Sequence, residues 1–247
     1  MTAYTEAADR RLPRGWAHLA LQFAIWIGFY VAYQIARGAA DRSEAAAFRN
    51  GQWIIDFQRS LGSMLELPLQ RFVERSTLLI QATSYTYWLS QFAVIGLALL
   101  WVYFRAHGRF FAFRNTLILA NLIGLVGYVT LPTAPPRMFP GAGFNDTLAD
   151  HAAVTHQTSL VAFASNPYAA MPSLHSCDAL IVGLVMAGVV RNRFAKALWL
   201  AWAPWVWFSV MATGNHFWLD IAAGILVAAV AGAVVYRKPL RRRLGRG

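Results

Sequence analysis

Cysteine and acidic residues are scarce in this sequence. Of its 247 residues, one is cysteine, Cys177, and 11 are Asp or Glu. A single cysteine excludes an intramolecular disulfide framework and any cysteine-rich zinc site. Charged residues of both signs make up only 13%, against about 25% in a typical soluble domain. Because 57% of the residues are hydrophobic, the composition predicts a membrane protein.

The excess of basic over acidic residues gives a net charge of +11. Such a charge is also typical of nucleic-acid-binding proteins, in which the basic residues gather on one face or along one helix. Here the 22 Lys and Arg residues lie mainly in short clusters between apolar runs. We therefore interpret them as membrane-topology signals and expect no nucleic-acid partner.

Several apolar segments approach or reach the roughly 20 residues that a membrane-spanning helix needs. They predict an all-α, polytopic membrane protein with six transmembrane helices, at residues 16–36, 77–104, 115–131, 172–190, 194–213 and 216–236. The first segment follows three arginines and precedes small residues, as a cleaved signal peptide would. Its apolar stretch exceeds the usual length of about 7 to 15 residues, which favours an uncleaved anchor.

Basic residues alternate between the connections of these segments. The stretches "RAHGRFFAFR", "RNRFAK" and "RKPLRRRLGRG" are strongly basic, whereas Arg137 is the only basic residue in 132–171. The positive-inside rule then places both termini in the cytoplasm. It places "PTAPPRMFP", "MPSLH" and "TGNH" on the extracytoplasmic face of a plasma (inner) membrane.

The connection 37–76 differs from the others because it is long and balanced in charge. Its apolar residues recur three and four positions apart, which predicts amphipathic helices that lie along the outer interface. We expect a single domain, 1–247, with the catalytic motifs within 130–220.

His216 and Asp220 are four residues apart in a segment predicted to be helical, so they share one face. A carboxylate at this spacing can hold the proton of one imidazole nitrogen and leave the other nitrogen free as a nucleophile. An isolated pair of this kind is also compatible with a structural hydrogen bond that seats a helix. The pair alone leaves both interpretations open.

The predicted topology brings His175, at the start of the fourth span, to the same outer face as His216. One histidine can then attack while the other protonates a leaving oxygen. Ser173 is positioned to cap the helix that begins there, whose free N–H groups favour an anion. An ordinary helix start with an interfacial histidine is the alternative. Asp178, one turn on, either orients His175 or faces a wet cavity.

Arg137 adds a cation to this predicted outer face. It lies among prolines 135, 136 and 140, which restrict the backbone. A guanidinium held in this way suits the oxygens of a phosphate. The alternative is an arginine that extends to lipid headgroups.

Two other functions use the same residues. His175, Asp178, His216 and Asp220 could bind a divalent cation, although the sequence has no H-E-x-x-H motif or acidic cluster. A non-enzymatic transporter could use the His and Asp residues as a proton relay, although the spans show no inverted repeat. We expect neither a metal nor a cofactor.

Three short motifs, in order and spacing, resemble those of the type 2 phosphatidic acid phosphatase superfamily. The family patterns K-x6-R-P, P-S-G-H and S-R-x5-H-x3-D correspond here to "TLPTAPPRM", "PSLH" and "SVMATGNHFWLD". The resemblance implies a phosphohistidine intermediate on His216, with Asp220 as its orienting partner and His175 as the acid on the leaving group. It further matches Arg137, Ser173 and Ser209 to the remaining motif positions, and it implies no metal.

Four positions depart from the family patterns: Thr130 stands for lysine, Met138 for proline, Leu174 for glycine and Val210 for arginine. Two of the three phosphate-binding cations are thereby missing, which costs several kcal/mol of transition-state stabilisation unless other groups replace them. The substitutes we expect are helix N-termini, Asn215 and the arginines Arg71 or Arg75.

The reduced pattern, with "MPSLHS" and "TGNHFWLD", looks more like the branch that contains inositol phosphorylceramide synthase. That branch resembles enzymes that move a phospho-headgroup from a glycerophospholipid to a lipid alcohol. A phosphodiester carries one fewer negative charge than a phosphate monoester, so it needs fewer cations. The resemblance therefore implies an inositol phosphotransferase-like enzyme with a phospholipid or lipid phosphate as its partner. A lipid phosphate phosphatase, with water as acceptor, stays the alternative, and the oligomeric state is left open.

Overall fold

The computed structural model describes residues 13–39, 43–147 and 166–244, and these residues form helices and no strands. The elements are α2 (Gly15–Ala39), α3 (Glu44–Ser60), α4 (Glu66–Val73), α5 (Thr77–Leu89), the π-helical turn η1 (Ser90–Val94), α6 (Ile95–Arg105), α7 (His107–Thr130), the 3₁₀ turns η2 (Pro136–Met138) and η3 (Pro140–Ala142), α10 (Leu174–Val189), α11 (Arg193–Ala212) and α12 (Trp218–Leu244). Arg10 and Arg11, part of the predicted N-terminal basic cluster, lie outside the described residues.

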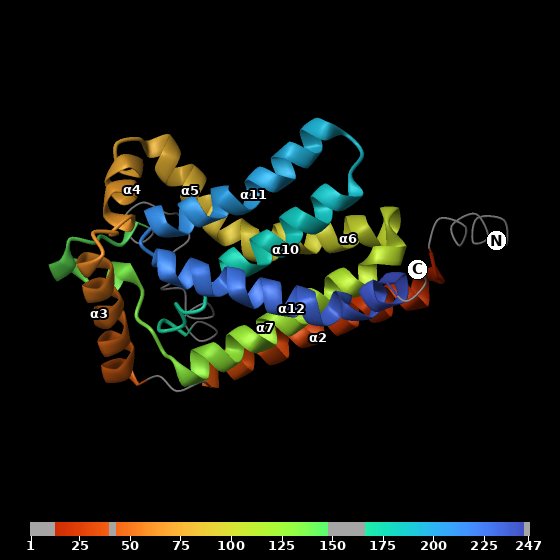
Figure 1. Ribbon diagram of the computed structural model, residues 1–247, viewed down its shortest axis with the longest axis horizontal. Coiled ribbons are helices and arrows are strands. Elements are labelled where there is room, and N and C mark those ends of the chain that lie inside the picture. Colours follow the sequence, from red (N-terminus) through yellow and green to blue (C-terminus); the bar gives the residue numbers. More distant parts are fainter. Residues whose placement is uncertain (1–12, 40–42, 148–165, 245–247) are drawn as a thin grey trace.

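The long helices run side by side between two ends of the molecule (Figure 1). Helix α10 lies centrally and packs against α7, α11 and α12, while α2 and α12 both pack against α7. Helices α3 and α4 lie at one end, next to the start of α12. The α6–α7 and α10–α11 connections lie at the other end. The starts of α10 and α12, which carry the predicted motifs, thus share the end where α3 and α4 lie.

Four of the described helical segments are long and apolar enough to cross a membrane: Gly15–Gly38, Thr77–Arg105, His107–Thr130 and Trp218–Arg237. They correspond to the first, second, third and sixth predicted spans, so the chain is a multi-pass membrane protein. Helix α10 is apolar but has only 16 residues, and the 20-residue α11 is not among these four. The six-span count therefore stays a prediction.

The third span begins earlier than predicted, at His107 rather than near residue 115. The prediction treated the arginines of "RAHGRFFAFR" as a loop, but the helix accommodates them. Arg109 donates a hydrogen bond to the carbonyl of Gly188 at 2.8 Å, and Arg114 donates one to the side chain of Gln22. Phe110 between them is buried in the core. Because the arginines have hydrogen-bond partners and the aromatic side chain is buried, the helix starts about two turns earlier than predicted.

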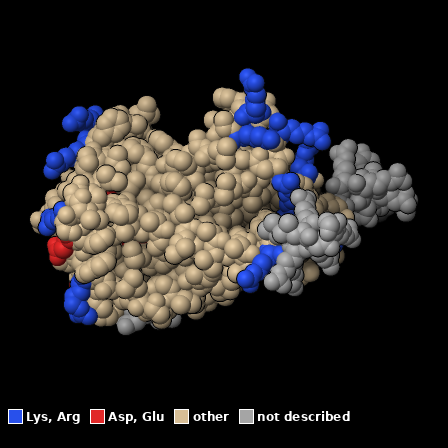
Figure 2. Space-filling view, in the orientation of Figure 1, with Lys and Arg blue, Asp and Glu red and all other residues tan. Residues whose placement is uncertain are grey.

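Charged side chains gather towards both ends of the face drawn in Figure 2, and a broad band between them shows almost none. Such a band matches the hydrocarbon layer of a bilayer, which excludes unpaired charges. Large apolar side chains are exposed on several of the long helices, among them Ile27 of α2, Leu97 of α6 and Leu226 of α12. These exposed side chains are consistent with helices that face lipid.

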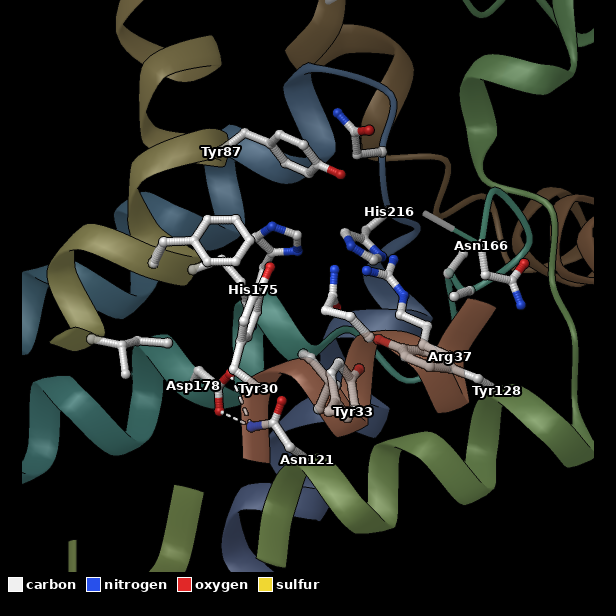
Figure 3. Close-up of a pocket in the computed structure, with 18 of the residues that line it drawn as sticks. Tyr30, Tyr33, Arg37, Tyr87, Asn121, Tyr128, Asn166, His175, Asp178 and His216 are labelled. Atoms are coloured by element: carbon white, nitrogen blue, oxygen red, sulfur yellow. Dashed lines mark hydrogen bonds between the residues drawn. The ribbon is translucent and has the colours of Figure 1, made fainter. Parts of the chain in front are cut away.

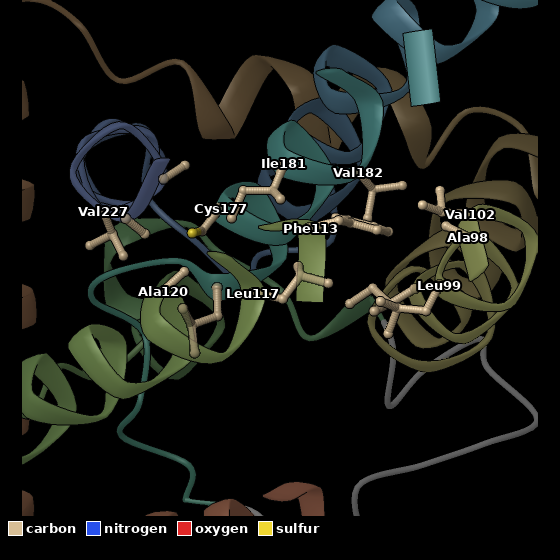
Figure 4. Close-up of a cluster of buried hydrophobic side chains, with 14 of the residues drawn as sticks. Ala98, Leu99, Val102, Phe113, Leu117, Ala120, Cys177, Ile181, Val182 and Val227 are labelled. Atoms are coloured by element: carbon tan, nitrogen blue, oxygen red, sulfur yellow. The ribbon is translucent and has the colours of Figure 1, made fainter. Parts of the chain in front are cut away.

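The main hydrophobic core joins α6, α7, α10 and α12 (Figure 4). Fully buried members are Val102, Phe113, Leu117, Cys177 and Val182. Close packing is helped by Gly224 of α12, where an added Cβ would overlap the carbonyl oxygen of Ser173. This glycine lets α12 approach the start of α10, which brings two of the predicted motifs together.

Helices α3 and α4 occupy the connection that we predicted to be amphipathic and interfacial. Their buried faces are partly polar: Gln58, Glu66 and Gln70 are almost inaccessible to solvent. Glu66 accepts hydrogen bonds from the backbone N–H of Trp218, at 2.6 Å, and from Gln58, at 2.8 Å. Gln70 donates to the carbonyl of Asn145 at 2.8 Å. The interfacial location stays a prediction, while the contacts show that these helices hold the start of α12 and the 131–147 segment.

Candidate active site

Three backbone hydrogen bonds and one isolated bridge tie the predicted motifs together. The N–H of Arg137 donates to the carbonyl of Gly214 at 2.8 Å, and the N–H of Ser173 donates to the carbonyl of Asp220 at 2.9 Å. Thr133 forms a parallel bridge with Ala169, supported by the bond from Thr133 N–H to Tyr168 O at 2.7 Å. Segments that are between 35 and 77 residues apart in the sequence are thus fixed beside one another by main-chain contacts.

His216 lies in the turn between α11 and α12, and only 4% of it is exposed. Its Nδ1 atom lies 3.4 Å from Oδ2 of Asp220, and the same oxygen accepts the backbone N–H of Phe217 at 2.8 Å. Asp220 therefore both caps the first turn of α12 and faces the imidazole. Nδ1 thus faces the carboxylate, and Nε2 lies on the opposite side of the ring.

Arg137 is held against the turn that precedes His216. Its guanidinium donates to the side-chain oxygen of Asn215 at 2.5 Å and lies 3.7 Å from the carboxylate of Asp146. Gly214, with φ of +67°, makes the turn possible, and Arg137 packs against it. Asn215 thus orients Arg137, the residue predicted to bind phosphate.

His175 lies in the first turn of α10 and faces His216 across the site (Figure 3). The two ring centroids are 5.6 Å apart, and the ring of Tyr87 stacks on His175 at 4.4 Å. This separation leaves the two imidazoles close enough to act on opposite sides of one phosphorus atom. The predicted juxtaposition of the second and third motifs is present in the structure.

Other predicted residues lie behind the site. Ser173 is the N-cap of α10, as predicted, and its hydroxyl accepts the N–H of Ser176 at 3.3 Å. Ser209 is fully buried, and its hydroxyl donates to the carbonyl of Trp205 at 2.8 Å, within α11. Their hydroxyls are thus engaged with helix backbone. A role for either in binding phosphate stays a prediction.

Asp178 is buried one turn beyond His175. It accepts hydrogen bonds from Gln91 at 2.8 Å and from Asn121 at 3.1 Å. Gln91 belongs to the π-helical turn η1, which interrupts the α5–α6 span beside the pocket. Asp178 therefore links α10 to two neighbouring spans, and π-helical turns are frequent at functional sites.

A pocket of about 780 Å³, partly open to solvent, lies in front of the two histidines. Its walls carry hydroxyl, amide and guanidinium groups from several spans. The polar residues that line it include Tyr30, Tyr33, Gln34, Arg37, Tyr87, Gln91, Asn121, Tyr128, Arg137, Asn166, His175, Asp178, Asn215 and His216. Apolar side chains, among them Trp26, Phe29 and Phe92, share the lining with these polar groups.

The tyrosines and Arg37 in this pocket were not identified from the sequence. Tyr30, Tyr33 and Arg37 come from α2 and Tyr128 from α7, both of which read as ordinary spans. Ionisable and polar residues inside a span are costly unless they face a polar cavity. Arg37 lies at the end of the first span, so this rule could have indicated from the sequence that it faces a polar cavity.

The two arginines named as substitute donors, Arg71 and Arg75, are exposed and lie outside the pocket lining. Thr130 is also exposed, and its hydroxyl donates to the carbonyl of Val126 at 2.9 Å. Val210 is fully buried. Among the described residues that line the pocket, the permanently charged cations are Arg37 and Arg137. Within the described ranges, no three His, Cys, Asp or Glu side chains are placed to hold a metal ion.

Burial lowers the pKa of His216 from 6.5 to about 3, and the positive charge of Arg137 acts in the same direction. Because the pKa of this group lies below the value of a free histidine, the neutral imidazole is the form present at every pH above about 3. A nucleophilic histidine must be neutral, so the environment favours that role.

This pKa can be checked by NMR of ¹⁵N-histidine-labelled protein without substrate. We expect the signals of His216, assigned by their loss in a His216→Gln variant, to stay those of a neutral ring from pH 8 to about pH 4. A titration with its midpoint near 6.5, the usual pKa of a histidine, would contradict the buried, uncharged environment.

Comparisons with known proteins agree with the motifs. A family model described as the PAP2 superfamily matches residues 52–234, and the chain therefore belongs to this superfamily. Phosphoinositol dihydroceramide synthase of Bacteroides thetaiotaomicron is 28% identical over 158 residues, which are 58% of this chain and 50% of that protein. The chain thus spans about half the length of this relative. No solved structure matches the chain. The resemblance to the type 2 phosphatidic acid phosphatase superfamily, and to its inositol phosphotransferase-like branch, is confirmed.

Proposed function

We propose that this chain is a membrane enzyme that transfers a phospho-headgroup from a phospholipid to a lipid or polyol alcohol through an intermediate on His216. The observation that carries the proposal is the pair of imidazoles, His175 and His216, with ring centroids 5.6 Å apart in a pocket shared with Arg137. Membership of the PAP2 superfamily and the similarity to a phosphoinositol-transferring synthase support it.

In the first step, Nε2 of His216 attacks the phosphorus atom of the donor lipid. A P–N bond forms, the P–O bond to the lipid alcohol breaks, and His175 gives its proton to the departing oxygen. Asp220 holds the His216 ring in place and stabilises the positive charge that develops on it. The donor leaves as a neutral lipid alcohol, and the phospho-headgroup stays on His216.

In the second step, neutral His175 takes the proton of the incoming hydroxyl. The acceptor oxygen attacks phosphorus, the P–N bond breaks, and His216 is regenerated with its partner Asp220 unchanged. Arg137 binds the equatorial oxygens, on which negative charge gathers in both transition states. The residues carry out this cycle without a metal or a cofactor.

The same proposal includes the topology. We place six spans in the membrane, with α10 and α11 as the fourth and fifth, and both termini in the cytoplasm of a plasma (inner) membrane. The α6–α7 and α10–α11 connections, which carry Arg105, Arg109, Arg191 and Arg193, lie at one end of the molecule (Figure 1). The positive-inside rule assigns that end to the cytoplasm, so the histidine site faces the extracytoplasmic side.

The acceptor distinguishes a transferase from a phosphatase. His216 is 4% exposed, and α4 together with the 131–147 segment packs over the turn that carries it. This cover limits the access of water to His216 from one side, which favours an alcohol as acceptor because water hydrolyses a covalent intermediate. Trp218 also packs over this turn, and its indole N–H donates to the carbonyl of Ser63 at 2.9 Å.

The proposal is tested with purified protein, phosphatidylinositol labelled in its headgroup, a ceramide-type lipid alcohol, and a metal chelator. We expect a new labelled phospholipid whose formation depends on the alcohol and is unaffected by the chelator. Labelled inositol phosphate in place of the new lipid indicates that water is the acceptor, and release of inorganic phosphate from a lipid phosphate indicates a phosphatase. The absence of both products with a panel of lipid phosphates, in protein that is folded and monodisperse, would contradict the proposed enzyme.

A further inference from the structure

Arg37 is the feature of the pocket that the motifs do not explain. It belongs to the last turn of α2, whereas the family match begins at residue 52. Figure 3 shows its side chain extending from α2 towards His216, on the side where Tyr33 and Tyr128 lie. A span that precedes the matched region thus brings a guanidinium to the histidine site.

The surroundings of Arg37 fix the position of its side chain but leave one of its hydrogen-bond donors without a partner. The guanidinium lies over the ring of Tyr128, with 5.7 Å from its carbon to the ring centroid, and this cation–π contact fixes its orientation. Its Nε atom is buried and has no hydrogen-bond partner among the described residues. A buried, unpaired donor of a charged group is costly, so a site of this kind calls for an anionic ligand.

The sequence lacks two of the basic residues of the family motifs, so a second cation at the phosphate must come from elsewhere in the chain. Thr130 and Val210 stand where the family patterns have lysine and arginine, and neither lines the pocket. Arg37 does line it, together with Arg137, His175 and His216. The charge of Arg37 also reaches His216, whose pKa it lowers together with burial and Arg137.

We propose that Arg37 is a phosphate-binding residue that acts with Arg137 as a pair of guanidinium groups on the non-bridging oxygens of a lipid phosphodiester. This inference rests on the proposed function, since it assigns a role at the same phosphorus atom. Two guanidinium groups match the two non-bridging oxygens of a diester, which share its single negative charge. Arg37 approaches from α2, and Arg137 from the 131–147 segment.

A structural role for Arg37 makes a different prediction. Basic residues in the last turn of a helix interact favourably with its dipole, and Arg37 occupies that position in α2. In that case its removal lowers stability but leaves the affinity for an oxyanion unchanged. The two roles are therefore separated by measuring anion binding and not only activity.

The first experiment measures binding of orthovanadate, which mimics a phosphoryl group in transfer, to the full-length protein in detergent by isothermal titration. We expect Arg37→Ala to weaken binding about 10- to 100-fold, the effect of losing a charged hydrogen bond to an anion. Arg37→Lys is expected to fall between Arg37→Ala and the unsubstituted protein, because it keeps the charge but loses the planar pair of donors. Arg49→Ala, at an exposed position on α3, is the matched control and is expected to bind as the unsubstituted protein does.

The second experiment asks whether free guanidinium restores headgroup transfer in Arg37→Ala. We expect Arg37→Ala to lower kcat/KM by about 10²-fold, as the loss of one oxyanion donor does, and low millimolar guanidinium to recover part of this loss. It is expected to have no such effect on Arg49→Ala. Recovery in this way requires an intact cavity at position 37, which a misfolded variant does not have.

Vanadate binding by Arg37→Lys and Arg37→Ala within twofold of the unsubstituted protein would overturn the inference. So would the failure of the unsubstituted protein to bind vanadate. The proposed function fails separately, if the unsubstituted protein binds vanadate in an Arg37-dependent manner but produces neither a new phospholipid nor inositol phosphate.

Discussion

Replacement of His216 with alanine is expected to reduce headgroup transfer by at least about 10⁴-fold, because loss of a catalytic nucleophile costs on the order of 10⁴ to 10⁶ in kcat. Burial and the charge of Arg137 keep the imidazole of His216 neutral, and Asp220 faces its Nδ1 atom. In the proposed mechanism His175, with its ring centroid 5.6 Å away, exchanges protons with the oxygens and does not attack phosphorus. The loss is measured as the initial rate of labelled phospholipid formation.

The matched control for His216→Ala is His107→Gln, since His107 is a half-buried histidine in the first turn of α7, away from the pocket lining. We expect it to retain activity. His216→Gln, which keeps a polar side chain of similar length, is expected to be as inactive as His216→Ala. Substantial turnover by either His216 variant, in protein that elutes as the unsubstituted protein does, would exclude the nucleophile assigned here.

Replacement of His175 with glutamine is expected to slow transfer from phosphatidylinositol by about 10² to 10⁴-fold, the usual contribution of a general acid. In the proposed mechanism, the side chain donates its proton to a departing lipid alkoxide, which is a poor leaving group. An inositol phosphodiester of p-nitrophenol has a leaving group that needs no proton. The defect in the first step should therefore be much smaller with that substrate.

The release of p-nitrophenol before any acceptor is added isolates this first step. In His175→Gln we expect a burst of p-nitrophenol near the burst of the unsubstituted protein. Turnover after the acceptor is added should be slow, because the acceptor hydroxyl is no longer deprotonated. Equal losses with both leaving groups would show that His175 has another role. A role in stacking against Tyr87 is the obvious one, since their rings lie 4.4 Å apart.

Much of the fold follows from simple patterns in the sequence. The apolar segments near 16–36, 77–104 and 216–236 correspond to α2, to α5 with α6, and to α12. The start of α7 was predicted wrongly because hydropathy counts an arginine as a cost and cannot see the carbonyl of Gly188 that receives it. Tertiary partners decide whether a charged residue ends a span or continues it.

Part of the candidate site could likewise be predicted from the sequence, and part could not. Local spacing relates His216 to Asp220 and positions Ser173 as a helix cap, and the structure has both contacts. The prediction that His216 is helical is wrong, because α12 begins at Trp218 and the contact is made from the turn before it. The topology predicts that His175 faces His216, which the ring contact confirms. Arg37 was not found because no motif surrounds it and an apolar helix does not reveal which side faces a cavity. Burial and the absence of a partner for its Nε appear only in the folded chain.

The P–N bond at His216 is the step on which every other role depends. It is measured directly by incubating the protein with headgroup-labelled phosphatidylinositol without acceptor, quenching at alkaline pH, and analysing the peptides by mass spectrometry. We predict a phosphoinositol adduct on His216 that is stable to base and labile to acid, and that disappears when the lipid alcohol is added. A labelled product formed at full rate with no adduct on His216, or with the adduct on another residue, would contradict the mechanism.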